Sequence, residues 1–300
     1  IVDPTADHTQ YLINQGGYIP VLAAATTTAI SSTPAELNIL DGVTSTAAEL
    51  NILDGVTATA AEINVLDASL KENNSIWIGS DPSGTTDTAS NSVAIGVTAL
   101  DSITTGDNNT AVGYASLTAN TTGTRNTAVG TSAGAAVTTG DDNTAVGYGA
   151  GDTISTGSDN TTIGSYSLTN NSTGASNTAV GYTALEANTT ASNNVAVGYA
   201  ALAANTTGAG SVAIGTSALA TNTTTSNNTA IGTSALTANT TGALNIAVGG
   251  YSLDANTTGG QNTGVGQNAL SANTTASYNV AVGADALLVN TTGASNVAIG

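Results

Sequence analysis

The stretch that decides the fold is NTAVGYTALEANTTASN, residues 177–193, and the next seventeen residues, 194–210, repeat its pattern as NVAVGYAALAANTTGAG. A glycine stands at position 79 and at every seventeenth position through 300, with no insertion. A fixed period over fourteen registers indicates a solenoid whose coils all have the same perimeter. We therefore predict an all-β chain over residues 75–300, a parallel β-solenoid or β-roll of seventeen-residue coils.

The composition excludes several classes of function. The chain has 300 residues, with 2 cationic and 20 acidic side chains, one histidine (His8) and no cysteine. The absence of cysteine excludes disulfides and thiolate chemistry. The small number of cationic side chains argues against binding nucleic acid or an anionic membrane. No nucleophile–base pair stands out, and no apolar run reaches the roughly 20 residues that span a bilayer. We predict no enzyme activity and no catalytic, cofactor-binding or metal site.

Both faces of the predicted strand are restricted in sequence. The residue before each repeat glycine is Val or Ile in all fourteen registers, and the residue two before it is Ala in eleven. Neighbouring residues of a strand point to opposite faces, so both faces favour apolar side chains. A single thin coil has one interior. We therefore expect the second face to pack against another copy of the chain.

Two columns are predicted to share the interior of the coil. From Leu100 onward the residue four after the glycine is Leu, but two coils have Gly134 and Gly151 instead. In those coils the position seven after the glycine, usually Asn, becomes Val137 or Ile154. Volume lost at one column is regained at the other, so both columns should face one core. The usual amides should then point inward and bond along the axis: Asn120, Asn188, Asn205, Asn222, Asn239, Asn256, Asn273 and Asn290.

Glycine and threonine mark the corners of the coil. The repeat glycine should either take a positive φ or allow a backbone to approach, from a turn or from a neighbouring chain. Thr88 and every seventeenth residue through Thr292 is Thr, followed in most coils by Gly and a polar pair, which predicts a turn. Trp77 replaces alanine in the first coil, where we expect it to cap the solenoid.

A second repeat precedes the solenoid. TPAELNILDGVTS, TAAELNILDGVTA and TAAEINVLDASLK begin at Thr33, Thr46 and Thr59. Each Thr precedes a Glu by three residues, which is the spacing of a capping box. We predict short capped helices of about two turns over residues 33–74, buried against other chains because isolated short helices are marginal. Residues 1–32 are expected to be an extended or attachment segment, and the chain to be a piece of a longer protein.

The two repeats together resemble those of tail fibres and related appendage proteins of marine bacteriophages, especially those of cyanobacteria. The resemblance covers residues 33–300. The N-x-A-(V/I)-G core is also similar to the head repeats of trimeric autotransporter adhesins, which form a left-handed β-roll of three chains with a somewhat shorter repeat. The resemblance implies a homotrimer. Its expected function is the shaft of a virion fibre, joined to a baseplate at one end and holding a distal receptor-binding module outside this chain. The alternative is the shaft or head of a bacterial surface adhesin.

Three ligand hypotheses compete with a purely structural role. Turn carboxylates could bind calcium but more often are solvated turn formers: Asp107, Asp141, Asp142 and Asp159. Tyrosines that follow the repeat glycine could stack on sugars, although packing or plain exposure is the commoner role: Tyr114, Tyr148, Tyr182 and Tyr199. A threonine ladder suits ice binding, but here the threonine pair lies in a predicted turn rather than on a flat strand, so ice binding is a minor alternative.

Overall fold

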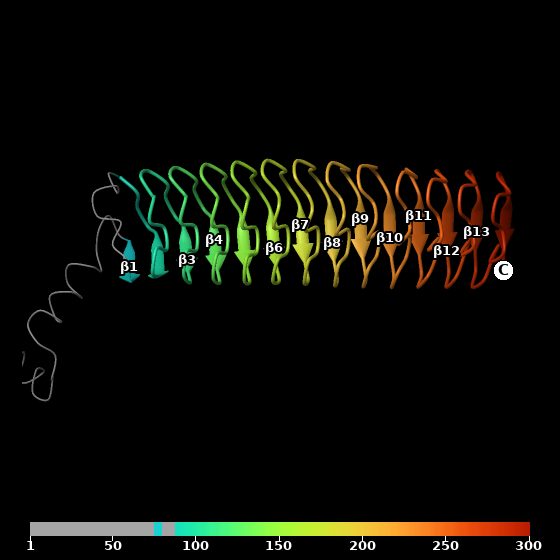
Figure 1. The fold of residues 1–300 in the computed structure, drawn as a ribbon, viewed down its shortest axis with the longest axis horizontal. Helices are drawn as coiled ribbons and strands as arrows, with labels where there is room; N and C mark the ends of the chain where they lie inside the picture. The colour runs from blue at the N-terminus through green and yellow to red at the C-terminus, as the bar shows by residue number, and fades with distance from the viewer. Residues whose placement is uncertain (1–74, 80–87) are drawn as a thin grey trace, which may run out of the picture. The chain divides into compact units, whose positions relative to one another are not determined.

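The computed structural model describes residues 75–79 and 88–300, which lie in one compact unit and form a row of stacked coils (Figure 1). Each coil contributes one short strand to a single fourteen-stranded sheet, whose strand order follows the sequence. The strands are β1 (Ile76–Gly79), β2 (Val93–Gly96), β3 (Thr110–Val112), β4 (Thr127–Val129), β5 (Thr144–Val146), β6 (Thr161–Ile163), β7 (Thr178–Val180), β8 (Val195–Val197), β9 (Val212–Ile214), β10 (Thr229–Ile231), β11 (Ile246–Val248), β12 (Thr263–Val265), β13 (Val280–Val282) and β14 (Val297–Ile299).

The register confirms the predicted solenoid. Every strand pair is parallel, and each residue pairs with the one seventeen positions later, as Ile76 does with Val93 and Ala230 with Ala247. The described residues include no helix. The helices predicted over residues 33–74 and the segment 1–32 lie outside the described residues, so those predictions stay untested.

The two faces of the sheet differ in burial. The residue two before each repeat glycine, usually alanine, points into the coil and is buried in every strand except the last; Ala128, for example, has no exposed surface. Its neighbour Val129 points outward and is 38% exposed. The interior predicted from the alternation is therefore the alanine face. The Val and Ile face lies on the surface of the single chain, and the partner predicted to cover it is not tested.

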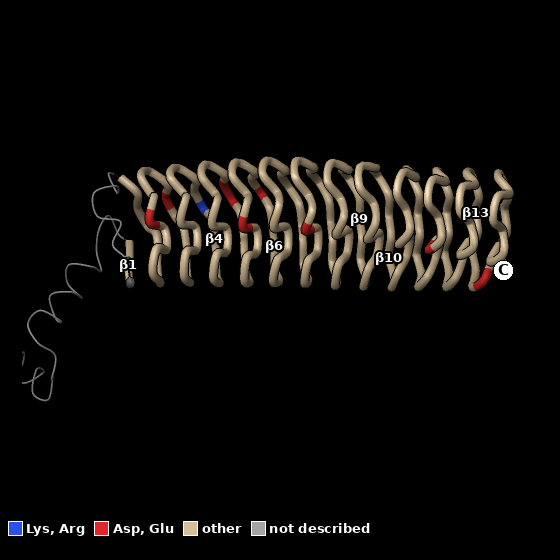
Figure 2. Tube along the Cα trace, viewed as in Figure 1, with Lys and Arg blue, Asp and Glu red and all other residues tan. Residues whose placement is uncertain are grey.

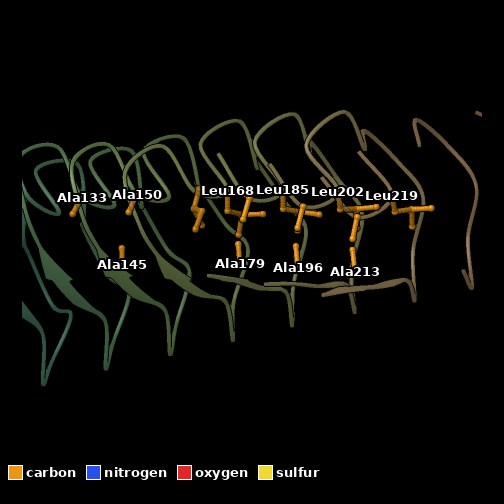
Figure 3. Close-up of a cluster of buried hydrophobic side chains, with 14 of the residues drawn as sticks. Ala133, Ala145, Ala150, Leu168, Ala179, Leu185, Ala196, Leu202, Ala213 and Leu219 are labelled. Carbon is orange, nitrogen blue, oxygen red and sulfur yellow. The ribbon is translucent and has the colours of Figure 1, made fainter. Parts of the chain in front are cut away.

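A narrow core runs along the inside of the coils (Figure 3). It consists of the strand alanines, a second alanine or serine column three residues after the repeat glycine, and the leucines next to it. Ala184, Leu185 and Ala196 are typical members and are fully buried. The core holds one leucine between two layers of alanine. We therefore expect a side chain larger than alanine on the strand to fit only in an unusual coil, such as the first. Trp77 in β1 is such a case, and it is 3% exposed.

Backbone hydrogen bonds link the coils outside the sheet as well. The amide of Leu185 donates to the carbonyl of Ala201 at 3.0 Å, and that of Thr189 donates to Thr206 at 3.0 Å. At a third place the bond runs the other way, from the amide of Asn193 back to Ala175 at 3.1 Å. The turns thus have their polar groups paired with the adjacent coil, as buried backbone requires.

The repeat glycines from Gly96 through Gly283 combine the two properties that the sequence offered as alternatives, a positive φ and the close approach of a backbone. Gly113 has a φ of +135°, and a Cβ built on it would lie 2.5 Å from the carbonyl oxygen of Gly130. The approaching backbone belongs to the next coil of the same chain. Any side chain here would force stacked coils apart, which explains why the column has no exception.

The leucine column adopts a backbone conformation that its residue type does not predict. Leu168 and Leu185 have φ values of 47° and 55°, in the left-handed region. This conformation costs an L-residue roughly 1–2 kcal/mol, and burial of a leucine side chain contributes about 1.5–3 kcal/mol. Burial therefore wins at most coils. Gly134 and Gly151 have φ values of 57° and 58°, so they keep the same backbone without the steric cost.

The predicted exchange of volume between two columns is confirmed. Val137 and Ile154 are 1% and 0% exposed, and both fill the space that a leucine leaves. A Cβ added to Gly134 would lie 3.4 Å from Val137 Cγ2, and one added to Gly151 would lie 2.8 Å from Ile154 Cδ1. Both columns face one interior.

Candidate functional site

The first amide ladder lies where the sequence predicted it. From Asn188 onward, the asparagine seven residues after the repeat glycine donates from Nδ2 to Oδ1 of the preceding coil's asparagine: the distances are 2.8 Å from Asn188 to Asn171 and 3.0 Å from Asn205 to Asn188. The same Nδ2 also donates to a turn carbonyl, as Asn205 does to Gly208 at 2.9 Å. These amides are paired, and all but Asn290 are fully buried, so they are structural groups and not free ligands.

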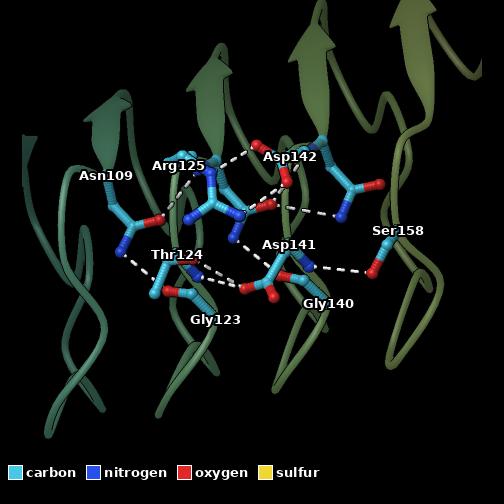
Figure 4. A network of polar contacts seen from close by, with 10 residues as sticks. Asn109, Gly123, Thr124, Arg125, Gly140, Asp141, Asp142 and Ser158 are labelled. Carbon is cyan, nitrogen blue, oxygen red and sulfur yellow. Dashed lines mark hydrogen bonds and ion pairs between the residues drawn. The ribbon is translucent and has the colours of Figure 1, made fainter.

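A second amide ladder, four residues before each repeat glycine, was not predicted. Its Oδ1 accepts from the backbone of the next coil, as Asn126 Oδ1 does from Asn143 N at 2.9 Å. Its Nδ2 donates to a turn carbonyl, as Asn109 does to Gly123 at 2.8 Å (Figure 4). The signal was present, because this column is Asn or Ser in every coil. Asparagine next to a turn is so common that the pattern did not separate a ladder from turn chemistry.

The turn aspartates also bond between coils. Asp107 Oδ1 accepts from the amide and hydroxyl of Ser90 at 2.8 and 2.9 Å, and Asp141 Oδ1 does the same for Thr124 at 2.7 and 2.9 Å (Figure 4). The carboxylates thus replace the water that a turn hydroxyl and amide would otherwise bind. No group of three or more potential metal ligands occurs among the described residues.

Arg125 and Asp142 form a bidentate ion pair on the surface. The Nε–Oδ1 distance is 2.6 Å and the Nη2–Oδ2 distance is 2.7 Å. The hydrogen bond from Arg125 lowers the pKa of Asp142 below its usual value, and the same bond raises the pKa of Arg125. Figure 2 shows how few charges the coils have. Asp152, elsewhere on the coils, has its pKa raised by burial.

Four tyrosines of neighbouring coils pack against one another. The ring centroids of Tyr148 and Tyr166 are 5.2 Å apart and those of Tyr166 and Tyr182 are 6.4 Å apart, both edge to face, while Tyr182 and Tyr199 are stacked at 5.6 Å. A hydrogen bond with Tyr148 raises the pKa of the Tyr166 hydroxyl. Sugar recognition needs open ring faces. The four rings contact one another but remain 38 to 57% exposed, and Tyr114 is 59% exposed, so the sugar-binding hypothesis stays untested.

The outward face of the sheet is a continuous row of uncharged, mostly apolar side chains along the described coils. Its two columns lie one and three residues before the repeat glycine and contain only Val, Ile and Thr in all fourteen strands. Its members range from partly buried to exposed; the exposed ones include Ile78, Ile95, Ile163, Ile214 and Ile246 at 48, 38, 41, 38 and 43%. An uncharged surface of this length is typical of a protein-binding face. We call these two columns the outward strand face.

No family model, no curated protein and no solved structure matches the chain. In the part of the chain that the structure describes, no helix is long and apolar enough to cross a membrane.

Proposed function

We propose that the chain is the shaft of a homotrimeric bacteriophage fibre, which holds a receptor-binding module at a fixed distance from the virion. The observation that supports this best is the outward strand face on an insertion-free stack of coils. A stack of this kind grows in one direction only, since each coil bonds just to its two neighbours. Its length is set by the number of repeats, which is the property a spacer needs.

The size of the outward strand face fits contact with other copies. Fourteen strands with two outward residues each give 28 positions. A stable protein interface uses about 20–30 residues on each side. In a homotrimer with parallel chains each face covers part of the next, and the row of Val and Ile leaves the water. The acidic surface that remains outside, with Arg125 the one cation among the described residues, disfavours nonspecific association.

The remaining parts of the proposal rest on the resemblance of the repeats. It includes a virion or other extracellular location, a baseplate or attachment protein at one end and a host receptor bound through another region. The alternative is the shaft or head of a trimeric adhesin on a bacterial surface. Both use the same coils. Labelling intact phage particles with an antibody to this chain separates them, since only the first proposal expects label on the virion.

The mass in solution tests the trimer. We expect sedimentation equilibrium of the wild-type chain to give three times the monomer mass of 28.9 kDa. The triple variant V180K/V197K/I214K places three charges on the outward strand face and should be monomeric. The control T173K/T190K/T207K adds the same charge at exposed turn positions and should keep the wild-type mass. A monomeric wild-type chain would contradict the proposal.

A further inference from the structure

One exposed column of the solenoid has the same residue in every coil. Thr stands nine residues after the repeat glycine in all thirteen coils from Thr88 through Thr292, and every member is exposed. Other exposed columns vary widely; the one three residues further on includes Asn, Arg, Asp, Gly, Leu and Tyr. We call this constant column the turn threonine ladder.

The hydroxyls of the ladder differ in their hydrogen bonding from those of the column just before it. In the preceding column the hydroxyl is used inside the structure, as when Thr121 Oγ1 donates to the carbonyl of Thr138 at 3.1 Å. That column accepts serine at Ser155 and Ser172. From Thr105 through Thr292 the ladder hydroxyls have no hydrogen-bond partner within the described residues. The hydrogen bond that explains the threonines of the preceding column therefore does not explain those of the ladder.

The ladder keeps both groups of the threonine side chain. A backbone preference for a β-branched residue would also admit Val or Ile, and a need for a hydroxyl alone would admit Ser. Val, Ile and Ser are all absent from this column in the thirteen coils. The residue that follows is a buried Gly or Ala in nearly every coil, so it does not cover the ladder. The sequence therefore maintains an open row of paired methyl and hydroxyl groups.

A rigid row with a fixed repeat suits a ligand with a fixed repeat. Successive strands of a sheet lie roughly 4.8 Å apart, which makes the ladder about 60 Å long. This spacing is close to the oxygen repeat along the a axis of ordinary ice. A hydroxyl can take the place of a lattice water while the methyl group fills the open space beside it. The column has no charge and no aromatic ring, which recognition of ions or sugars would favour.

We infer that the turn threonine ladder binds ice. The sequence disfavoured this function because the threonine pair was predicted to lie in a turn. The structure separates the pair into one column that bonds inside the chain and one that is exposed along every coil. The inference does not depend on the proposed fibre or on the trimer, and it adds a binding activity to a chain whose other function is mechanical.

Thermal hysteresis and inhibition of ice recrystallisation by the purified full chain test the inference. The variant T139K/T224K/T241K interrupts the ladder, and the control T131K/T216K/T233K makes the same change at exposed threonines of the same three coils. We expect activity in the wild type, the same activity in the control and a loss of about tenfold in the ladder variant, because a broken array loses its avidity. Circular dichroism checks that both variants are folded. An inactive wild-type chain, or an equal loss in both variants, would overturn the inference.

Discussion

The coils before and after Gly164 fill the same interior in two ways. In the first group the column seven residues after the repeat glycine has Ile103, Asn120, Val137 and Ile154. In the second group it is asparagine in every coil, from Asn171 through Asn290, and the amides form a ladder with distances of 2.8 to 3.5 Å. The backbone register is the same in both groups. The fold therefore depends on the size of the interior group and on whether its polar atoms find partners, and less on its polarity.

Asn120 shows which partner is essential. It lies between Ile103 and Val137, so it has no amide above or below it. Its side chain bonds instead to its own turn: Nδ2 donates to the carbonyl of Gly123 at 3.0 Å, and Oδ1 accepts from the amide of Gly123 at 3.0 Å. The local turn satisfies a single amide, and the ladder adds a further bond only where asparagines follow one another.

The largest effect should come from a feature that both groups share. Gly113→Ala and Gly215→Ala each place a Cβ 2.5 Å from the carbonyl oxygen of the next repeat glycine. That neighbour is backbone and cannot turn aside, so each change should lower the free energy of unfolding by roughly 4–5 kcal/mol. Urea unfolding of the two variants measures this. A strong loss in only one group would mean that the coils do not stack alike.

Replacing the Gly and Val of one coil by the Leu and Asn of the others should show that the two columns are energetically coupled. In a coil of the first group, Val137→Asn leaves a gap beside Gly134, and Gly134→Leu overfills the space beside Val137. The double variant restores the usual Leu and Asn and lets residue 137 bond to Asn120. We expect each single variant to be destabilised and the double variant to be near wild type, with a coupling energy of about 2 kcal/mol. Additive losses in the three unfolding curves would show that the two columns do not share one space.

Removal of one amide should cost more in the ladder than outside it. Asn205→Val deprives Asn188 Oδ1 of its donor, and we expect a loss of about 2–3 kcal/mol for this buried acceptor. Asn120→Val is the matched change in the first group. There the carbonyl of Gly123 still accepts from Asn109 Nδ2 at 2.8 Å, so the loss should be roughly 1 kcal/mol. Thermal unfolding of both variants gives the comparison, and equal losses would argue against a contribution from the ladder.

The smallest effect is expected at the surface of the first group. Arg125→Gln removes the ion pair with Asp142, and exposed pairs of this kind contribute little to stability. The pKa of Asp142 is lowered in the folded chain, so the stabilisation from the pair is present at neutral pH and is lost as the pH falls through that lowered pKa. We expect the wild type and the variant to unfold at nearly the same temperature at pH 7. NMR titration should show the pKa of Asp142 rising toward its ordinary value in the variant.

Much of the interior could be predicted from the sequence because the repeats of one chain can be compared with one another. The joint change at Gly134 and Val137 was enough to place two columns in one space, and the structure confirms it. The left-handed leucines could not be predicted, since leucine gives no sign of a positive φ. The second amide ladder was missed because asparagine before a strand also suits a turn. The trimer stays a prediction, because a single chain shows an apolar face but not what covers it.

The central claim is that each seventeen-residue coil lies on the one before it. The chain has no cysteine, so pairs of cysteines introduced at exposed ladder positions can be spin-labelled without background. Electron–electron resonance on T139C/T224C, five coils apart, and T139C/T275C, eight coils apart, measures the stacking directly when labelled chains are diluted with unlabelled ones. We predict distances of about 24 and 38 Å, from roughly 4.8 Å per coil. Distances that do not increase in proportion to the number of coils would contradict the stack.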